Sequence, residues 1–294
     1  MAERYTPRRM SDRRDGRRLH TLSPVFQLTP FMMRSPADAE YFFTDRAELT
    51  RAESWVRVRR DEGDGELSLM HVFIAAYVRT LCQWPALNRF VAGRFLYARD
   101  HIDVVLASSR SGTADSGSMN VKVRFLPTDT IYDISRKIRA QLESLQADES
   151  AARRERLAST LIKTPRFVLT AAMGVVRWLD YHGWLGEAWT DRSPFHGSAV
   201  LSDEGSHGLP PVSRTLNSLG SMPVSISIGR RHTEVELTRT GAAEERYYAD
   251  YTVTVDSRIA DSAYVGAAFR YFRQCLADPS RLEQKPPRVN DDAM

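Results

Sequence analysis

Residues 67–84, LSLMHVFIAAYVRTLCQW, are the segment that most restricts how this chain can fold. The run is nearly all apolar and ends at Pro85, which predicts a helix that stops there. A helix that is apolar around its whole circumference has to be buried on several sides. We therefore expect a domain built around this helix, and we interpret His71 within it as a residue that satisfies a local hydrogen bond.

Several segments have the length and pattern of β-strands. Residues 101–108 are a continuous apolar run, and residues 119–125 alternate apolar and polar side chains. The segment between them, residues 109–118, is rich in small polar residues and predicts a loop. Strand patterns return after Phe195, in residues 195–202, 223–229, 233–237 and 246–256. The last of these has one apolar and one polar face, which predicts a largely antiparallel sheet with one solvated face.

Two further helices are expected to cover this sheet. Thr130 and Asp133 can cap the first helix, whose apolar stripe is Ile131, Ile134, Ile138, Leu142 and Leu145. The second helix spans about residues 259–277 and has Tyr264, Ala268, Tyr271, Phe272 and Cys275 at helical spacing. Residues 24–49 predict an irregular lead-in followed by a short strand. Together these elements predict a single α+β domain with helices packed on a sheet.

The positive charge is concentrated at the N-terminus. Residues 1–20 contain seven arginines and three acidic residues, a net charge of +4 that equals the excess for the whole chain, 41 − 37 = +4. The remainder is therefore neutral, and a solvated arm is favoured over one that contacts nucleic acid or a membrane. We expect a flexible basic arm over residues 1–24, a domain over 25–285 and a flexible tail over 286–294. The start of the sequence has no signal-peptide pattern, so we expect a cytoplasmic protein.

The two cysteines and the tryptophan-rich region do not indicate a metal or redox site. Cys82 and Cys275 lie in apolar helical patterns without a second ligand nearby, which predicts buried, inert thiols and no metal site. The apolar run in residues 165–190 stops at Arg177, short of the ~18 residues that a membrane span needs. We expect a core or lid helix there, and contact with a membrane interface remains an open alternative.

Four motifs occur in an order that resembles a known family. They are WPALNRF, YARDHIDVVLA, PVSISIG and YTVTVDSRIADSAYVGAAFRYFRQCLADP. Over about residues 25–283 the chain resembles the catalytic domain of the dihydrolipoyl acyltransferase component of 2-oxoacid dehydrogenase complexes. That family shares its fold with chloramphenicol acetyltransferase. The resemblance implies a chloramphenicol acetyltransferase-like sandwich and a homotrimer with its sites at the subunit boundaries.

The resemblance also shows where the catalytic machinery has changed. In the family signature D-H-R-x-x-D-G, the histidine takes the proton from a coenzyme A or dihydrolipoamide thiol. Such a thiol is mostly protonated at neutral pH, since its pKa is about 8.5, so the reaction needs a base. This chain has Ser257 at that position, and a hydroxyl is not a useful base. Asp256, Arg258 and Asp261 match the family, whereas the final glycine is Ser262. Loss of a general base typically costs ~10²–10⁴ in rate.

A second part of the family's machinery, its oxyanion element, is also altered. The corresponding stretch here is SDEG, in which Ser202 and Gly205 match while Asp203 and Glu204 replace neutral residues. Carboxylates aimed at a developing negative charge would raise the barrier. His207, which follows in the same loop, is the best candidate for a substitute base. His196 is excluded, because roughly 20 Å of extended chain separates it from Ser202.

These observations leave three hypotheses of function. The favoured one is a catalytically degraded trimeric scaffold or thioester-binding module, with coenzyme A as a possible ligand or substrate. The first alternative is an active acyltransferase with altered machinery around His207, Ser202 or Ser257. The second is a partner protein that contacts a membrane or nucleic acid through the basic arm. The sequence has no lipoyl attachment site and leaves open the acyl group, the acceptor and the role of the insertion at 150–192.

Overall fold

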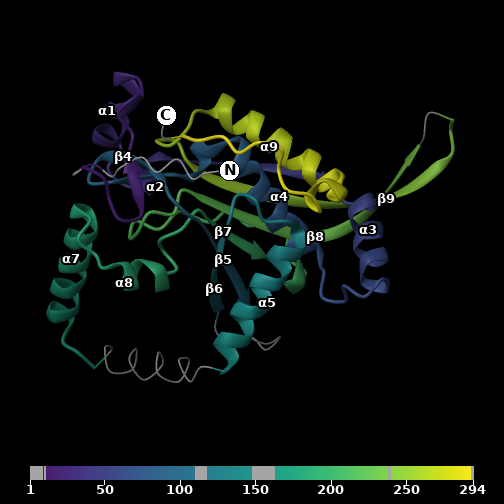
Figure 1. The fold of residues 1–294 in the computed structure, drawn as a ribbon, viewed down its shortest axis with the longest axis horizontal. Helices are drawn as coiled ribbons and strands as arrows, with labels where there is room; N and C mark the ends of the chain where they lie inside the picture. The colour runs from purple at the N-terminus through teal and green to yellow at the C-terminus, as the bar shows by residue number, and fades with distance from the viewer. Residues whose placement is uncertain (1–8, 10, 110–117, 148–162, 238–239, 293–294) are drawn as a thin grey trace.

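The computed structural model describes residue 9 and residues 11–109, 118–147, 163–237 and 240–292 (Figure 1). The main sheet has the strand order β2-β9-β8-β7-β5-β6. Its strands are β2 (Glu40–Glu48), β5 (Ile102–Ser109), β6 (Ser118–Phe125), β7 (Ala199–Asp203), β8 (Val224–Leu237) and β9 (Ala243–Asp256). β7 runs parallel to both β5 and β8, and the other pairs are antiparallel. The predicted α+β class is confirmed, and the sheet is mixed.

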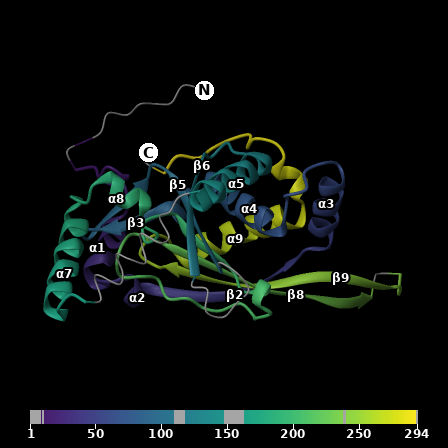
Figure 2. The same cartoon turned by 90° about the horizontal axis from the view of Figure 1, so that it is seen from below.

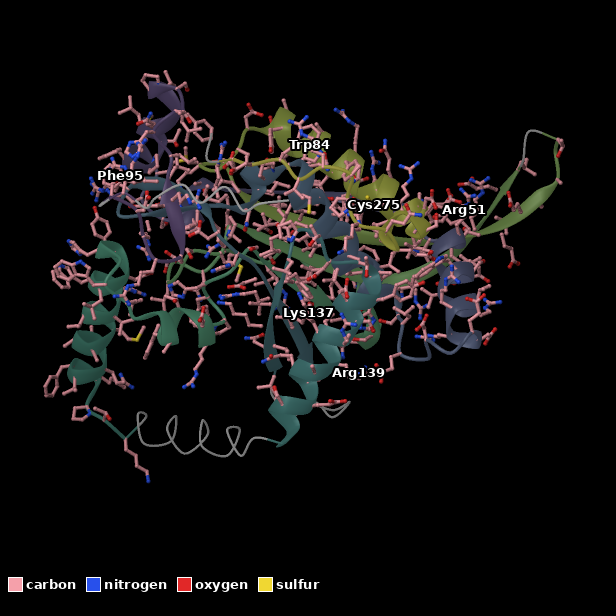
Figure 3. The ribbon with its side chains drawn as sticks, viewed as in Figure 1. Arg51, Trp84, Phe95, Lys137, Arg139 and Cys275 are labelled. Carbon is pink, nitrogen blue, oxygen red and sulfur yellow. The ribbon has the colours of Figure 1, made fainter. Side chains whose placement is uncertain are left out.

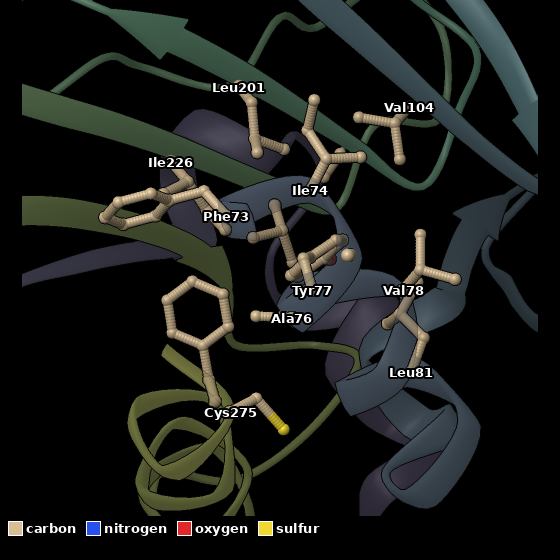
Figure 4. Packing of buried hydrophobic residues seen from close by; sticks show 14 of the residues in the cluster. Phe73, Ile74, Ala76, Tyr77, Val78, Leu81, Val104, Leu201, Ile226 and Cys275 are labelled. Carbon is tan, nitrogen blue, oxygen red and sulfur yellow. The ribbon is translucent and has the colours of Figure 1, made fainter. Parts of the chain in front are cut away.

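The predicted apolar helix is α4 (Leu69–Gln83), and it lies in the centre of the core. It shares one face of the sheet with α5 (Ile131–Ala147) and α9 (Ser262–Ala277), as Figure 2 shows. Every residue of α4 from Val72 to Cys82 is buried. Phe73 packs edge-on against Tyr251 and also contacts Phe272, with ring centroids 6.4 Å and 6.0 Å away. Figure 4 shows the same packing toward Leu201 and Ile226 of the sheet. The helix therefore joins the sheet to α9.

The cap predicted for α5 is present. Thr130 Oγ1 donates to Asp133 Oδ2 at 2.9 Å and accepts from the Asp133 amide at 3.3 Å. Ile131, Ile134 and Ile138 are buried against the core. The sequence pattern thus placed the start of this helix and the first part of its inward face correctly, whereas Leu142 of the predicted stripe is 37% exposed.

The N-terminal region is more regular than predicted. Instead of an irregular lead-in, α1 (Pro24–Met32) and α2 (Pro36–Ala39) precede β2. Ser23 caps α1 by accepting from the Phe26 amide at 3.3 Å, and proline occupies the first position of both helices, where it needs no amide hydrogen. Serine followed by proline was the sequence signal for these two helix starts.

Both predicted terminal segments contact the domain. Part of the arm forms β1 (Gly16–Arg18) in a small sheet with β4 (Phe95–Arg99) and β3 (Arg89–Ala92). At the other end, the Asn290 amide donates to Cys82 O at 2.8 Å, and Asp292 pairs with Arg89 at 2.6 Å. Residues 286–292 therefore pack on the domain instead of forming a free tail, because their polar groups find partners there.

The prediction of a solvated sheet face is wrong for the middle of the sheet. Ser225, Ser227 and Thr252 are buried although their side chains are polar. The segment of residues 209–222 supplies partners on this side: the Val212 amide donates to Ser227 Oγ at 3.0 Å, and the Leu216 amide donates to Glu40 Oε2 at 2.7 Å. Polar side chains that alternate along a strand can thus face a polar loop instead of water.

The sequence pattern predicts two strands where the structure has one. Residues 223–229 and 233–237 were predicted as separate strands, and they belong to the single strand β8. The register shifts between Ile228 and Arg231, which is a β-bulge or similar irregularity. Beyond this point β8 and β9 continue as a hairpin that extends past α3 (Thr50–Asp61) (Figure 1).

The tryptophan-rich region forms α7 (Arg166–His182) and α8 (Glu187–Arg192). The expectation was a core or lid helix, and since no residue of α7 is buried, a core helix is excluded. No helix in the described ranges is long and apolar enough to span a membrane. The loop predicted at 109–118 and the first part of the insertion at 150–192 lie largely outside the described residues.

His71 at the start of α4 makes the stability of the fold depend on pH. The Ser68 amide donates to His71 Nδ1 at 3.1 Å, which confirms a local hydrogen-bonding role. Burial lowers the pKa of His71 below its ordinary value of 6.5. The unfolded chain therefore binds a proton more readily, and the stabilisation present above pH 6.5 is lost as the pH falls below it.

We expect a His71→Gln variant to lose less stability on acidification than the unmodified protein. Glutamine can accept from the same Ser68 amide, and it does not titrate. Urea denaturation at about pH 7 and about pH 5 measures the free energy of unfolding of both proteins, in the window where a histidine of depressed pKa titrates. Equal losses in the two proteins would contradict this assignment.

Candidate functional site

Ser257 lies in the turn that follows β9. Its amide donates to Ala39 O at 3.0 Å, and its hydroxyl points at Met33 Sδ, 3.9 Å away. A thioether sulfur is only a weak hydrogen-bond acceptor. This contact therefore does not turn the Ser257 hydroxyl into a base. The segment between α1 and α2 therefore packs against the position where the family carries its histidine.

The matching residues beside Ser257 form a buried ion pair. Arg258 Nη2 lies 2.6 Å from Asp256 Oδ2, and both side chains are less than 5% exposed. Arg258 Nη1 also donates to Met33 O at 3.2 Å. Asp261 caps α9 by accepting from the Tyr264 amide at 2.7 Å. These three charged residues hold the turn, α9 and the α1–α2 connection in place.

The stretch SDEG, which the resemblance matches to the family's oxyanion element, lies at the end of β7. Ser202 is buried, and its Oγ has no hydrogen-bond partner within the described ranges. Asp203 accepts from the Ser206 amide at 3.1 Å, and Glu204 pairs with Arg214 at 2.5 Å. The two substituted carboxylates therefore have partners of their own. A Cβ on Gly205 would lie 2.6 Å from Gly229 O, so only glycine fits there without a shift of the backbone.

The candidate residues do not meet within one chain. Ser202 pairs with Ser227 on β8, which pairs with Thr252 on β9, and Ser257 follows five residues later. At about 3.4 Å per residue along β9 and about 4.8 Å between strands, the two serines are roughly 20 Å apart. A site that used both would have to combine residues from two copies of the chain.

A cavity of about 660 Å³ opens between α3, the start of α4 and the end of β7. Its apolar side includes Val56, Met70, Phe73 and Ile228. Its polar side combines three arginines with three carboxylates: Arg57, Arg60, Arg231, Glu53, Asp61 and Asp203. Arg231 pairs with Glu53 at 3.1 Å, whereas Arg57 has no ion pair among the described residues. No histidine is among the residues that line this cavity.

His207 lies beside this cavity but not in its wall. It ends the short 3-10 helix Gly205–His207 and is exposed, while Gly205 and Ser206 line the cavity. The resemblance placed His207 near the reaction channel, and only the two residues before it reach the cavity. A base at this position would need a different side-chain or loop position to reach a bound group.

His196 is held in a buried network away from Ser202. Its Nδ1 contacts Ser193 Oγ at 2.9 Å, and its Nε2 contacts Asp180 Oδ1 at 3.3 Å. Burial alone would raise the pKa of Asp180, but the hydrogen bonds from His196 and Arg13 lower it below the ordinary value. His196 therefore belongs to a structural network and remains excluded as a base.

A second, very small cavity marks a charged cluster that the sequence did not predict. Asp103 on β5 pairs with Arg124 on β6 at 2.7 Å, and Arg124 also pairs with Asp191 of α8 at 2.7 Å. Burial lowers the pKa of nearby Lys122. These ion pairs fasten the insertion to the sheet edge. The sequence did contain a signal for this cluster. Lys122 and Arg124 are two residues apart on a predicted strand, which puts both cations on the face away from the core.

Neither cysteine is a nucleophile candidate. Both thiols are buried, and burial raises the pKa of Cys82 to about 12 and that of Cys275 to about 11. In the part of the chain that the structure describes, no group of three histidine, cysteine or acidic residues is arranged to hold a metal ion.

Comparison with known proteins gives matches of structure only. No family model and no curated protein sequence matches the chain. The probable dihydrolipoamide acetyltransferase of Listeria monocytogenes 4b F2365 superposes with a TM-score of 0.55 at 13% identity, over 92% of this chain and 97% of that one. The cubic core of the pyruvate dehydrogenase multienzyme complex and the Azotobacter vinelandii dihydrolipoamide acetyltransferase each give 0.53 at 12% identity, over 88% of both chains.

The chain therefore has the fold of dihydrolipoamide acetyltransferase catalytic cores, as the order of its sequence motifs implied. At this identity the likeness establishes the fold alone. The A. vinelandii structure was determined to examine a serine, a histidine and an asparagine in that enzyme's catalytic mechanism, the last two being four positions apart. The same spacing separates Ser257 from Asp261 in this chain.

The buried pair next to Ser257 gives a stability prediction. We expect Arg258→Ala to destabilise the protein by about 3–5 kcal/mol, because it leaves the Asp256 carboxylate buried without its partner. Ser257→Ala should change the free energy of unfolding by less than about 1 kcal/mol, since the serine hydroxyl has only the weak contact with Met33. Urea denaturation measures both variants. A small effect of Arg258→Ala would show that the pair does not hold the turn.

Proposed function

We propose that this protein is a catalytically degraded relative of the dihydrolipoamide acetyltransferase catalytic domain that binds an acyl thioester, such as an acyl-coenzyme A, as a trimeric scaffold. The observation that carries the proposal is the cavity at the end of β7, which has arginines and an apolar wall but no histidine. Its volume of about 660 Å³ lies within the range of sites for small organic ligands.

The chemistry of the cavity supports a phosphorylated thioester. Arginine guanidinium groups bind phosphate oxygens through paired hydrogen bonds, and Arg57 has no carboxylate partner that a ligand would have to displace. The wall that includes Met70 and Phe73 can accept the apolar part of such a ligand. The carboxylates of Glu53, Asp61 and Asp203 limit the net positive charge, so we expect modest affinity.

The lack of a base supports binding without turnover. Acyl transfer between thioesters requires a thiolate, and the group that would form it in the family is an imidazole at the position of Ser257. The hydroxyl of Ser257 contacts Met33 and lines neither cavity. Bound thioester would therefore remain intact for much longer than one catalytic cycle of an ordinary enzyme.

The separation of the candidate residues supports a trimer. Since Ser202 and Ser257 lie roughly 20 Å apart in one chain, a site at a subunit boundary is the arrangement that could bring them together. Among the structures with this fold is the cubic core of a multienzyme complex. A scaffold role needs only that such contacts between copies persist after the histidine is lost.

An active acyltransferase with His207 as its base is the second candidate. It is favoured by one observation, that Gly205 and Ser206 of the same short helix line the cavity. A modest movement of this helix would bring the imidazole toward a bound thioester.

We expect coenzyme A to raise the melting temperature of the unmodified protein. Arg57→Ala should weaken coenzyme A binding about tenfold, because one charge-assisted hydrogen bond to phosphate is lost. Arg136→Ala, on the exposed side of α5, is the matched control and should bind as the unmodified protein does. Titration calorimetry measures the affinities. Unchanged binding by Arg57→Ala would remove this cavity as the ligand site.

We also expect no acetyl transfer from acetyl-coenzyme A to dihydrolipoamide by the unmodified protein. The assay compares it with Ser257→His and His207→Ala. Turnover gained by Ser257→His would show that only the base is missing. Turnover by the unmodified protein at the rate of an ordinary enzyme would refute the scaffold proposal, and its loss in His207→Ala would establish the second candidate. Light scattering tests the trimer, and a monomer would exclude the scaffold.

A further inference from the structure

Helix α7 has a continuous apolar stripe that no other described part of the chain covers. Phe167, Ala171, Val175 and Trp178 are spaced by four, four and three residues, so they lie along one side of the helix. Phe167 is 76% exposed, Val175 55% and Trp178 51%. An apolar helix face of this length gains free energy when something covers it.

The side of α7 that faces the domain is a different one. Val176, Leu179 and Asp180 are half-buried, and Asp180 pairs with Arg13 at 3.2 Å. Given about 100° of rotation per residue, Val176 and Asp180 lie roughly 100–180° around the helix from Phe167 and Val175, and Leu179 lies at the edge of the stripe. In Figure 1, α7 stands at the end of the molecule opposite the β8–β9 hairpin. The stripe is therefore an outer surface of the chain.

Aromatic side chains gather at the C-terminal end of this stripe. Trp178 and Trp184 pack edge to face with ring centroids 5.2 Å apart, and His182 lies between them and contacts both. Phe95 is exposed nearby on β4, where Arg18 stacks on its ring at 3.4 Å (Figure 3). Tryptophan combines a large apolar ring with an N–H donor, which suits it to the boundary between water and hydrocarbon.

The charges around the stripe are positive. Arg166 and Arg177 are exposed on the helix, and neither has a carboxylate partner in the described part of the chain. Asp180 is the only acidic residue of α7, and its carboxylate is held by Arg13 and His196. Through Arg13, the arginine-rich N-terminal segment also meets the domain at this end of α7. Within α7 itself, the surface thus combines exposed apolar groups with unpaired cations, and its one carboxylate is paired.

We propose that α7 binds the surface of a membrane that contains anionic phospholipids, with its stripe inserted at the level of the headgroups. Arginines beside an exposed stripe of phenylalanine, valine and tryptophan are the arrangement of an interfacial helix. The occupant has to be negatively charged and apolar at once, and an anionic bilayer surface meets both conditions. This contact is independent of the thioester cavity, which α7 does not line.

Sedimentation with vesicles tests the proposal on the full-length chain. We expect the unmodified protein to bind vesicles of phosphatidylcholine mixed with phosphatidylglycerol, and to bind pure phosphatidylcholine weakly. High salt should weaken binding because it screens the arginines. Phe167→Glu and Val175→Glu should each weaken binding about tenfold or more, because a charge then enters the apolar stripe.

Val235→Glu and Leu237→Glu are the matched controls, since both residues are equally exposed apolar positions at the far end of β8. They should bind vesicles as the unmodified protein does. Equal weakening in the controls, or no binding by the unmodified protein, overturns the proposal. Light scattering without lipid tests the alternative that a second copy of the chain covers the stripe. If Val175→Glu lowers the oligomer mass and the unmodified protein does not bind vesicles, the stripe is a contact between copies of the chain.

Discussion

Complete burial of α4 is the constraint on which the rest of the structure depends. Exposure of its apolar side chains to water would cost free energy on every side. The sheet, α5 and α9 therefore all have to pack around it. That packing sets where the end of β7 and the irregularity of β8 near Gly229 lie relative to the start of α4, and the large cavity lies at this junction. The core and the candidate ligand site are therefore consequences of the same helix.

The turn around Ser257 is held by its neighbouring side chains, and the serine hydroxyl contributes little to it. The Asp256–Arg258 pair, the capping Asp261 and the Met33 contacts are all structural interactions, and none of them needs a histidine. Under the proposed function, a hydroxyl in place of an imidazole at position 257 removes proton transfer and leaves these interactions in place. Stability and chemistry are carried here by different side chains of one short segment, so they can change independently.

Much of the fold could be predicted from local patterns. The apolar run of α4, the cap of α5 at Thr130 and the alternation of β6 and β9 each follow from nearest-neighbour rules. The failures have a common cause. The polar face of the sheet was predicted to be solvated because alternation along a strand does not show that residues 209–222 fold back over it, and a core helix was one expectation for α7 because an apolar helix is usually buried.

The sequence by itself determined the fold class and the order of the motifs, and it led to the proposal that a general base is absent, because these depend on residue type and spacing along the chain. Only the tertiary structure decided that Ser202 and Ser257 lie far apart, that His207 is outside the cavity wall and that α7 stands uncovered. Such facts depend on which distant segments meet, and local periodicity contains no information about that. The sequence gives the chemistry of each side chain, whereas tertiary packing determines which side chains are its neighbours.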